Sequence, residues 1–178
     1  YEQPFYKIGR YSFQFPWVGA QQNNLTAAIN NLRRVNARRA DVQTETQRVE
    51  LALAESLRQR GFAVEVGYRP LATEEDDAGE VDLICHQDGV LLLLEVKSGY
   101  IRSTRHEVWL HRTNTLRKAA WQLRRKQVAV LSALMTDEDL RARLDYHGQQ
   151  PEADLRAWIV DTSIELDGQS VDGFRVVS

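Results

Sequence analysis

The chain has 178 residues, 43% of them hydrophobic, which suits one domain with a sizeable core, or one domain plus an appendage. Its formal net charge of -2 excludes a globally basic surface, so any nucleic acid must bind at a local basic patch. The single cysteine, Cys85, excludes a disulfide framework and a cysteine-based zinc site and favours a reducing, cytoplasmic location. No apolar run approaches the roughly 20 residues that span a bilayer, so we expect no membrane partner.

The first 40 residues differ from the rest of the chain. They are rich in aromatic side chains and lack a clean hydrophobic period. We therefore expect residues 1–40 to be an N-terminal extension or the end of a preceding domain, and residues 41–178 to form one domain. Because the sequence starts at Tyr1 rather than at a methionine, we also expect it to belong to a longer protein with further domains.

The remaining residues alternate between helical and strand-like patterns. A helix is predicted to start at Asp41 or Thr44 and to end at Gly61, and Asp88-Gly89 is a strong signal for a two-residue hairpin turn. The resulting order, α-β-β-β-α-β, predicts an α/β fold with a mixed central β-sheet flanked by helices. In chain order we predict a helix over 41–61, strands over 63–68, 81–86 and 90–97, a short hairpin around 107–111, helices over 115–135 and 137–144, a buried strand over 155–163 and an edge strand over 173–177.

Two carboxylates lie inside the hairpin, in the segment GEVDLICHQDGVLLLLEVKSG. With a two-residue turn, Gln87 faces Val90, and the same register places Asp82 opposite Glu95. Side chains alternate along a strand, so Lys97 shares their face of the sheet. Like charges directly opposite each other destabilise a sheet, and a divalent cation bound between two carboxylates about 5 Å apart at Cβ would remove the conflict.

A third carboxylate comes from the first predicted helix. Leu53, Ala54 and Leu57 follow Glu50 at the i+3, i+4 and i+7 positions, so Glu50 lies in the middle of the apolar stripe. Each acid also has a simpler interpretation. Asp82 could be a hydrogen-bonded structural carboxylate, Glu95 and Lys97 an ion pair on an edge strand, and Glu50 a side chain that reaches water. A shared metal site explains all of them together.

The motif of Asp82, twelve intervening residues and Glu95-Val96-Lys97, preceded by a helical Glu50, resembles the PD-(D/E)xK nuclease superfamily. Residues 41–161 look most like its nuclease-related (NERD) and Mrr or Holliday-junction-resolvase-like branches. One departure is Glu80-Val81, which stands where the superfamily name has a proline; NERD and Mrr-like members often carry GE(I/V)D there. The resemblance implies a restriction-endonuclease-like core.

The resemblance also implies metal-dependent hydrolysis of phosphodiester bonds. Asp82 and Glu95 would hold Mg²⁺ or Mn²⁺ with help from the Val96 backbone carbonyl, and Lys97 would orient water or stabilise the transition state. Glu50 would complete the site, bind a second metal or position water. In related families a later helix supplies a glutamine, and Gln122 matches that role; a solvated helix face is the alternative interpretation.

Positive charge is concentrated directly after Lys97. A phosphate backbone would have to pass there, and phosphate contacts supply most non-specific affinity for nucleic acid. No base-reading motif is visible, so we expect weak sequence preference. The residues predicted to bind nucleic acid are Arg102, Arg105, Arg112, Arg117, Lys118, Arg124, Arg125 and Lys126.

Other side chains are predicted to have structural roles. Cys85 alternates with Asp82 and should be buried on the opposite face of the sheet, whereas His86 should be exposed near the turn. The tryptophans at positions 109, 121 and 158 are expected to pack in the core or on strands.

The sequence thus predicts a Mg²⁺- or Mn²⁺-dependent deoxyribonuclease that serves as a cytoplasmic module of a larger DNA-processing or defence protein. We expect it to cut internally rather than from an end. A nuclease fold retained for nucleic-acid or protein binding is the first alternative, and a regulatory domain of a multi-domain ATPase is the second. RNA as substrate, the strandedness of the substrate and a homodimer are left open.

Overall fold

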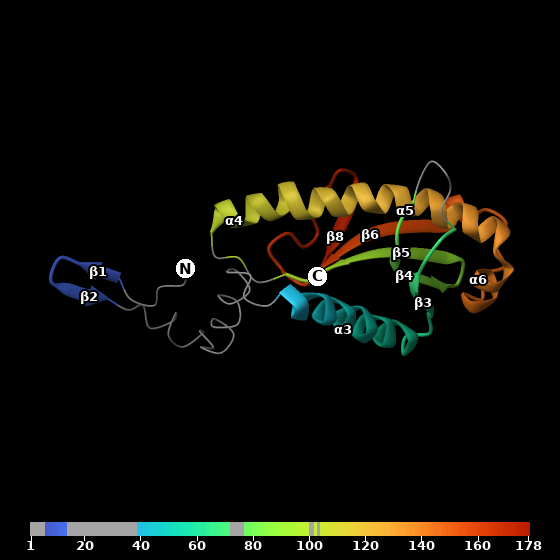
Figure 1. Ribbon diagram of the computed structural model, residues 1–178, viewed down its shortest axis with the longest axis horizontal. Helices are drawn as coiled ribbons and strands as arrows, with labels where there is room; N and C mark the ends of the chain where they lie inside the picture. The colour runs from blue at the N-terminus through green and yellow to red at the C-terminus, as the bar shows by residue number, and fades with distance from the viewer. Residues whose placement is uncertain (1–5, 14–38, 72–76, 100–101, 103) are drawn as a thin grey trace.

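The computed structural model describes residues 6–13, 39–71, 77–99, 102 and 104–178 (Figure 1). A two-stranded antiparallel hairpin is formed by β1 (Tyr6–Ile8) and β2 (Tyr11–Phe13). The main sheet has six strands in the order β3-β4-β5-β6-β8-β7. Its strands are β3 (Ala63–Tyr68), β4 (Val81–Gln87), β5 (Val90–Lys97), β6 (Leu155–Asp161), β7 (Ser170–Val171) and β8 (Phe174–Val177).

Strand directions make this sheet mixed, as predicted. β3, β4 and β5 are joined antiparallel, whereas β5 pairs with β6, and β6 with β8, in parallel. The parallel pairing of β5 and β6 requires a crossover, which a long helix provides. Because β5 and β6 run in the same direction, their C-terminal residues, Lys97 and Asp161, are neighbours in the sheet.

The turn between β4 and β5 has the predicted geometry. Asp88 and Gly89 have φ angles of 50° and 79°, the pair of positive values that a type I′ hairpin turn requires. Gln87 pairs with Val90, and the pairing continues to Leu83 opposite Leu94. The register deduced from the sequence is therefore confirmed.

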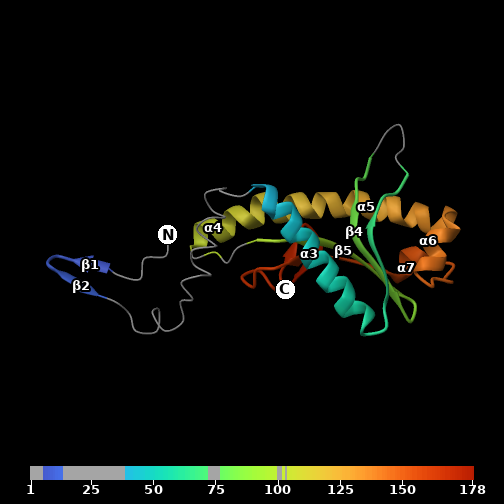
Figure 2. The same ribbon diagram turned by 60° about the horizontal axis from the view of Figure 1, so that its bottom comes forward.

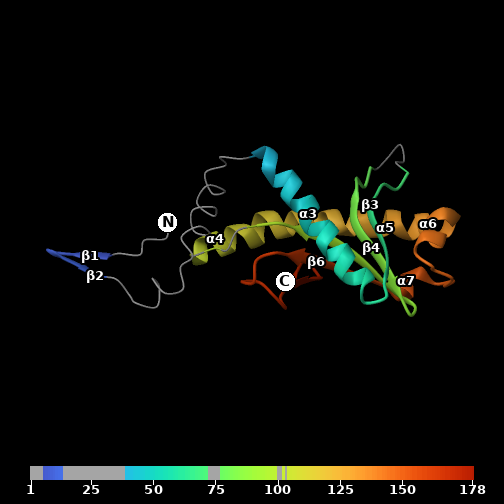
Figure 3. The same cartoon turned by 90° about the horizontal axis from the view of Figure 1, so that it is seen from below.

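Helices cover both faces of the sheet (Figure 1). The helix α3 (Arg39–Arg58) crosses the strands obliquely on one face (Figure 2 and Figure 3). There it packs Ala54 against a cluster that includes Leu83 and Val96. The helix α5 (Arg117–Thr136) covers the other face, where Leu123 shares a cluster with Leu93. The short helices α6 (Glu138–Arg143) and α7 (Pro151–Asp154) follow, and none of the described helices combines the length and apolar character that a membrane span requires.

The predicted hairpin around residues 107–111 is wrong. This segment is the helix α4 (Arg105–Leu110), which continues through a π-helical turn, η1 (His111–Leu116), into α5. The signal for it is a capping box, in which Thr104 and Glu107 each accept from the other's backbone N–H. Two smaller differences concern element limits: α3 begins at Arg39, before the predicted start, and β8 is not at the edge because β7 pairs with it.

Candidate active site

The ends of β4 and β5 bring Asp82 and Glu95 to one face of the sheet. The two strands pair as far as Leu83 and Leu94. One residue further, the Asp82 side chain takes over as the partner: its Oδ2 accepts a hydrogen bond from the Val96 backbone N–H at 2.7 Å. This bond fixes the orientation of the Asp82 carboxylate and leaves Oδ1 for another partner.

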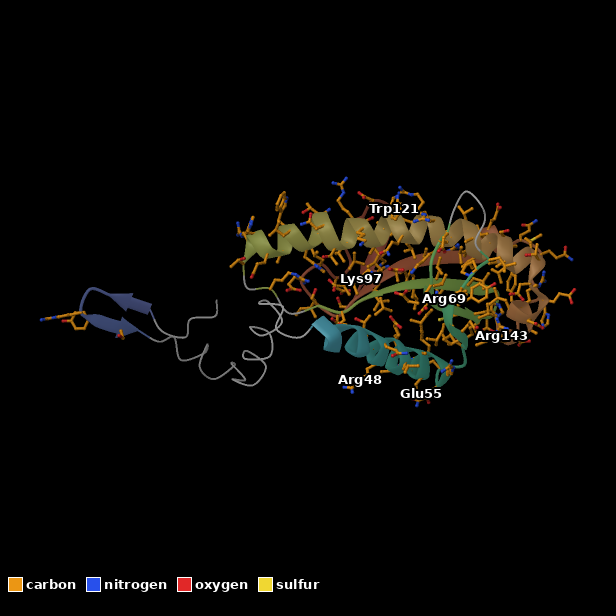
Figure 4. All side chains as sticks on the ribbon, in the orientation of Figure 1. Arg48, Glu55, Arg69, Lys97, Trp121 and Arg143 are labelled. Carbon is orange, nitrogen blue, oxygen red and sulfur yellow. The ribbon has the colours of Figure 1, made fainter. Side chains whose placement is uncertain are left out.

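Two lysines bind these carboxylates. Lys97 Nζ lies 2.6 Å from Glu95 Oε1, and Lys126 Nζ, from α5, lies 3.0 Å from Asp82 Oδ1 and also contacts Glu95 Oε2. The side chains of Glu95 and Lys126 are only 1% and 4% exposed, whereas Lys97 is 24% exposed. The four groups form a charge cluster at the end of β5, with Lys97 between this strand and α5 (Figure 4).

The position of Lys126 corrects the sequence analysis. It was expected on the basic surface, but it is buried, and its ammonium group lies between the two acids and reduces their repulsion. The divalent cation expected at the same acids stays a prediction. The sequence carries a signal for this position, because Ala119, Leu123, Lys126 and Val130 follow one another at intervals of four, three and four residues, and all are buried. Lys126 thus lies on the core-facing stripe of α5.

The charges of the cluster raise the pKa values of both Lys126 and Glu50. Burial alone would lower the pKa of Lys126, but the attraction of Asp82 and Glu95 outweighs burial and raises it. Glu50, on α3, has its pKa raised to about 7 by burial and by repulsion from Asp82, Glu80 and Glu95, which Lys126 partly offsets. Glu50 is therefore close enough to the pair for their charges to repel, and its predicted part in a metal site stays a prediction.

This coupling predicts a pH-dependent stability. The folded-state pKa of Glu50 exceeds its unfolded value of 4.5, so the folded protein binds this proton more tightly and loses stability as pH rises from about 4.5 to about 7. We expect Glu50→Gln to remove this loss. Urea unfolding in the presence of EDTA from pH 4.5 to 8 should show a growing advantage of the variant at high pH. Glu55→Gln, on the exposed side of α3, is the matched control, and equal slopes for wild type and Glu50→Gln would contradict the prediction.

The donor set can be tested against the expected metal. Within the described residues, no group of three or more histidine, cysteine, aspartate or glutamate side chains is arranged to hold an ion. Asp82 Oδ1 and Glu95 Oε2 nevertheless converge on one cation, the Lys126 ammonium, so they could converge on another. Mg²⁺ commonly uses one or two carboxylates and keeps several waters, which fits two convergent oxygens.

Gln122 lies one helical turn before Lys126 and is half-buried. Among the described residues it makes no side-chain hydrogen bond to the carboxylates, so its predicted role remains a prediction. The Val96 backbone, expected to offer its carbonyl to a metal, uses its N–H to hold Asp82.

The basic residues after Lys97 divide into two kinds. Arg102 is buried, donates to Ser163 Oγ at 2.8 Å and lies 3.7 Å from Glu165, so its guanidinium group is committed to the interior. Together with Lys126, it does not fit the predicted phosphate-binding surface. The other predicted residues are exposed or half-buried on α4, η1 and α5: Arg105, Arg112, Arg117, Lys118, Arg124 and Arg125.

Two tryptophans on this helix correct a further prediction. Trp109 and Trp121 are exposed rather than buried, and Trp121 lies on the side of α5 turned away from the sheet (Figure 4). The Arg125 guanidinium lies 4.5 Å from the centre of the Trp121 ring. Only Trp158, half-buried beside the α3-side cluster, packs as predicted.

One of the hollows in the described surface is basic. Its volume is about 490 Å³, and Arg105, Trp109 and Arg112 contribute to its lining. A larger hollow, of about 820 Å³, lies between the second half of α5 and residues 149–153 and contains none of the predicted site residues. Size alone therefore does not locate the charge cluster.

Cys85 and His86 are both structural. Cys85 is buried in the cluster on the α3 side, as predicted, and burial raises the pKa of its thiol to about 12. His86 was expected to be exposed, but it is half-buried, with Nδ1 3.0 Å from the Leu144 carbonyl oxygen and Nε2 accepting from the Gly89 N–H. It ties the hairpin turn to the end of α6.

Neither the family models nor the curated proteins compared with the chain give a match. The resemblance to PD-(D/E)xK nucleases therefore depends on the motif residues and on the α/β arrangement that presents them.

Proposed function

We propose that this domain is a metal-dependent nuclease that hydrolyses phosphodiester bonds of DNA. The observation that carries the proposal is the convergence of Asp82 and Glu95 on a single cation, with Lys97 beside them at the end of β5. Buried like charges that share a cation at a strand end are unusual in a purely structural core. A cytoplasmic location and a place within a larger DNA-processing protein are part of the proposal.

The residues that would hold Mg²⁺ or Mn²⁺ are Asp82 and Glu95, with the Val96 carbonyl. Glu50 does not form a metal-binding group of three with the two acids, so its proposed part is to position water from α3. The bound ion would supply a water of lowered pKa and would offset negative charge on the phosphate. Asp82 is oriented for this by the Val96 N–H, and Lys97 is held within reach of the same point by Glu95. Lys97, the most exposed member of the cluster, would orient water or contact the phosphate.

The exposed face of α4, η1 and α5 is the proposed DNA surface. Arginines bind phosphates, and an exposed tryptophan can stack on a base without sequence preference. The hollow lined by Arg105, Trp109 and Arg112 offers both arginines for phosphate contacts and a tryptophan for base stacking. Because these contacts join exposed opposite charges, binding should weaken as salt is raised. Arg117 pairs with Asp172 at 3.4 Å, so it would have to exchange this carboxylate for a phosphate.

The proposal is tested with supercoiled plasmid and Mn²⁺. Wild type should nick the plasmid, whereas Asp82→Ala and Lys97→Ala should lose nicking because each removes a group that contacts the ion or the phosphate. Arg143→Gln, which removes one exposed positive charge on α6, is the control and should nick like wild type. Circular dichroism shows whether each variant is folded. Equal nicking by wild type and both variants would reject the proposal.

One observation favours the alternative of a DNA-binding module without cleavage. Lys97 and Lys126 together offset the two charges of Asp82 and Glu95, so the cluster does not need a metal for its charges to be compensated. A module of this kind would bind DNA in a salt-dependent manner and would fail to nick plasmid with Mg²⁺ or Mn²⁺. The same plasmid experiment, run beside a filter-binding titration, separates the two functions.

A further inference from the structure

Lys126 occupies the point at which the two carboxylates converge. Its ammonium group contacts Asp82 Oδ1 at 3.0 Å and also Glu95 Oε2, and its side chain is almost fully buried. A divalent ion held by these two oxygens would need the same place, since both cations are bound by the same acceptors. The ammonium and the metal are therefore competitors.

The place of Lys126 on α5 brings its ammonium group to the carboxylates. Lys126 lies on the buried stripe of α5, between Leu123 and Val130, so its stem is packed against the sheet and leads to the carboxylates. Lys97, in contrast, contacts the other oxygen of Glu95, Oε1, and is partly exposed. Lys97 can thus remain in place while the position held by Lys126 changes its occupant.

We propose that Lys126 is a built-in counter-ion that holds the metal position in the metal-free protein and is exchanged for the divalent ion when it binds. This inference rests on the proposed function. The exchange would keep the acids compensated before metal arrives and would make metal affinity lower than the carboxylates alone could give. The displaced ammonium would then be free to contact a phosphate, which a lysine binds as a point charge.

Metal binding by variants is the first test. Isothermal titration with Mn²⁺ should give weak binding to wild type and binding tighter by about tenfold or more to Lys126→Met, the change expected when one charge-assisted hydrogen bond no longer has to be broken. Methionine keeps the length of the buried stem. Arg143→Gln, which also removes one positive charge but lies on α6, should bind Mn²⁺ like wild type.

The second test uses the wild-type protein and needs no variant to fold. Lysines are acetylated with N-hydroxysuccinimidyl acetate, with and without Mg²⁺, and mass spectrometry follows each site. Lys126 should react slowly without Mg²⁺ and about tenfold faster with it, whereas exposed Lys118 on the same helix should react equally in both.

The outcomes separate the two proposals. If wild type binds Mn²⁺ but Lys126 stays protected and Lys126→Met gains no affinity, the exchange is overturned and the nuclease proposal is unaffected. If neither wild type nor Lys126→Met binds Mn²⁺ or Mg²⁺, the metal-dependent function is rejected, and the exchange is rejected with it.

Discussion

Glu95→Gln is expected to destabilise the protein by about 3 to 5 kcal/mol, the range found when one partner of a buried ion pair is removed. Glu95 is 1% exposed and binds Lys97 through Oε1 and Lys126 through Oε2. Glutamine has the same shape, but its terminal amide has an NH₂ group in place of one carboxylate oxygen, and this group would face an ammonium. The variant therefore leaves a buried positive charge with poor compensation, and the free energy of unfolding falls.

Urea unfolding at pH 7 measures this loss as a lower midpoint. Glu55→Gln is the matched control, because Glu55 is exposed on α3, and it should change the free energy of unfolding by no more than about 0.5 kcal/mol. Combining Glu95→Gln with Lys126→Met should recover part of the loss, since the second change removes the uncompensated ammonium. A loss below about 1 kcal/mol for Glu95→Gln would mean that the cluster is hydrated and contradicts the burial argument.

Much of the sheet could be predicted because a few local signals fix it. Asp88-Gly89 sets the turn, the turn sets the register, and the register places Asp82 and Glu95 on one face. The stripe that starts at Glu50 likewise identifies the side of α3 that meets the sheet, where Ala54 is buried. In both cases a short-range pattern determines a long-range contact.

The predictions that failed concern the long helical segment formed by α4, η1 and α5. Between Lys97 and Lys126 the basic residues were assigned to one surface, although helical periodicity separates buried Lys126 from exposed Lys118. The same periodicity places Trp121 on the outer side of α5. A hairpin around His111 would interrupt that periodicity, whereas the capping box at Thr104 is a signal that a helix starts there.

A second buried network was also missed, because its members are far apart in the sequence. Asp161, at the end of β6, is fully buried, and its Oδ2 accepts from Ser163 Oγ at 2.6 Å and lies 2.7 Å from His111 Nε2. Arg102 donates to Ser163 Oγ. Because Asp161 neighbours Lys97 in the sheet, these contacts join the start of η1 to the strand that carries the proposed site.

Asp161→Asn is expected to lower the free energy of unfolding at pH 7 by about 2 to 3 kcal/mol, the contribution of hydrogen bonds to a charged group. Burial alone would raise the pKa of Asp161, but the hydrogen bonds from His111 and Ser163 and the charge of Arg102 outweigh it and lower the pKa. A depressed folded-state pKa means that this stabilisation is complete above the unfolded value of about 3.9 and is lost as pH falls through the folded value.

The difference in unfolding free energy between wild type and Asp161→Asn should therefore be larger at pH 5 than below about pH 4, as protons enter the wild-type carboxylate. Urea titrations across this range measure it, and Asp145→Asn, at an exposed aspartate, should show no such dependence. If the difference instead grew as pH fell, Asp161 would have a raised pKa, and burial would outweigh its hydrogen bonds. The charged form of Asp161 would then destabilise the junction of η1 and β6 rather than stabilise it.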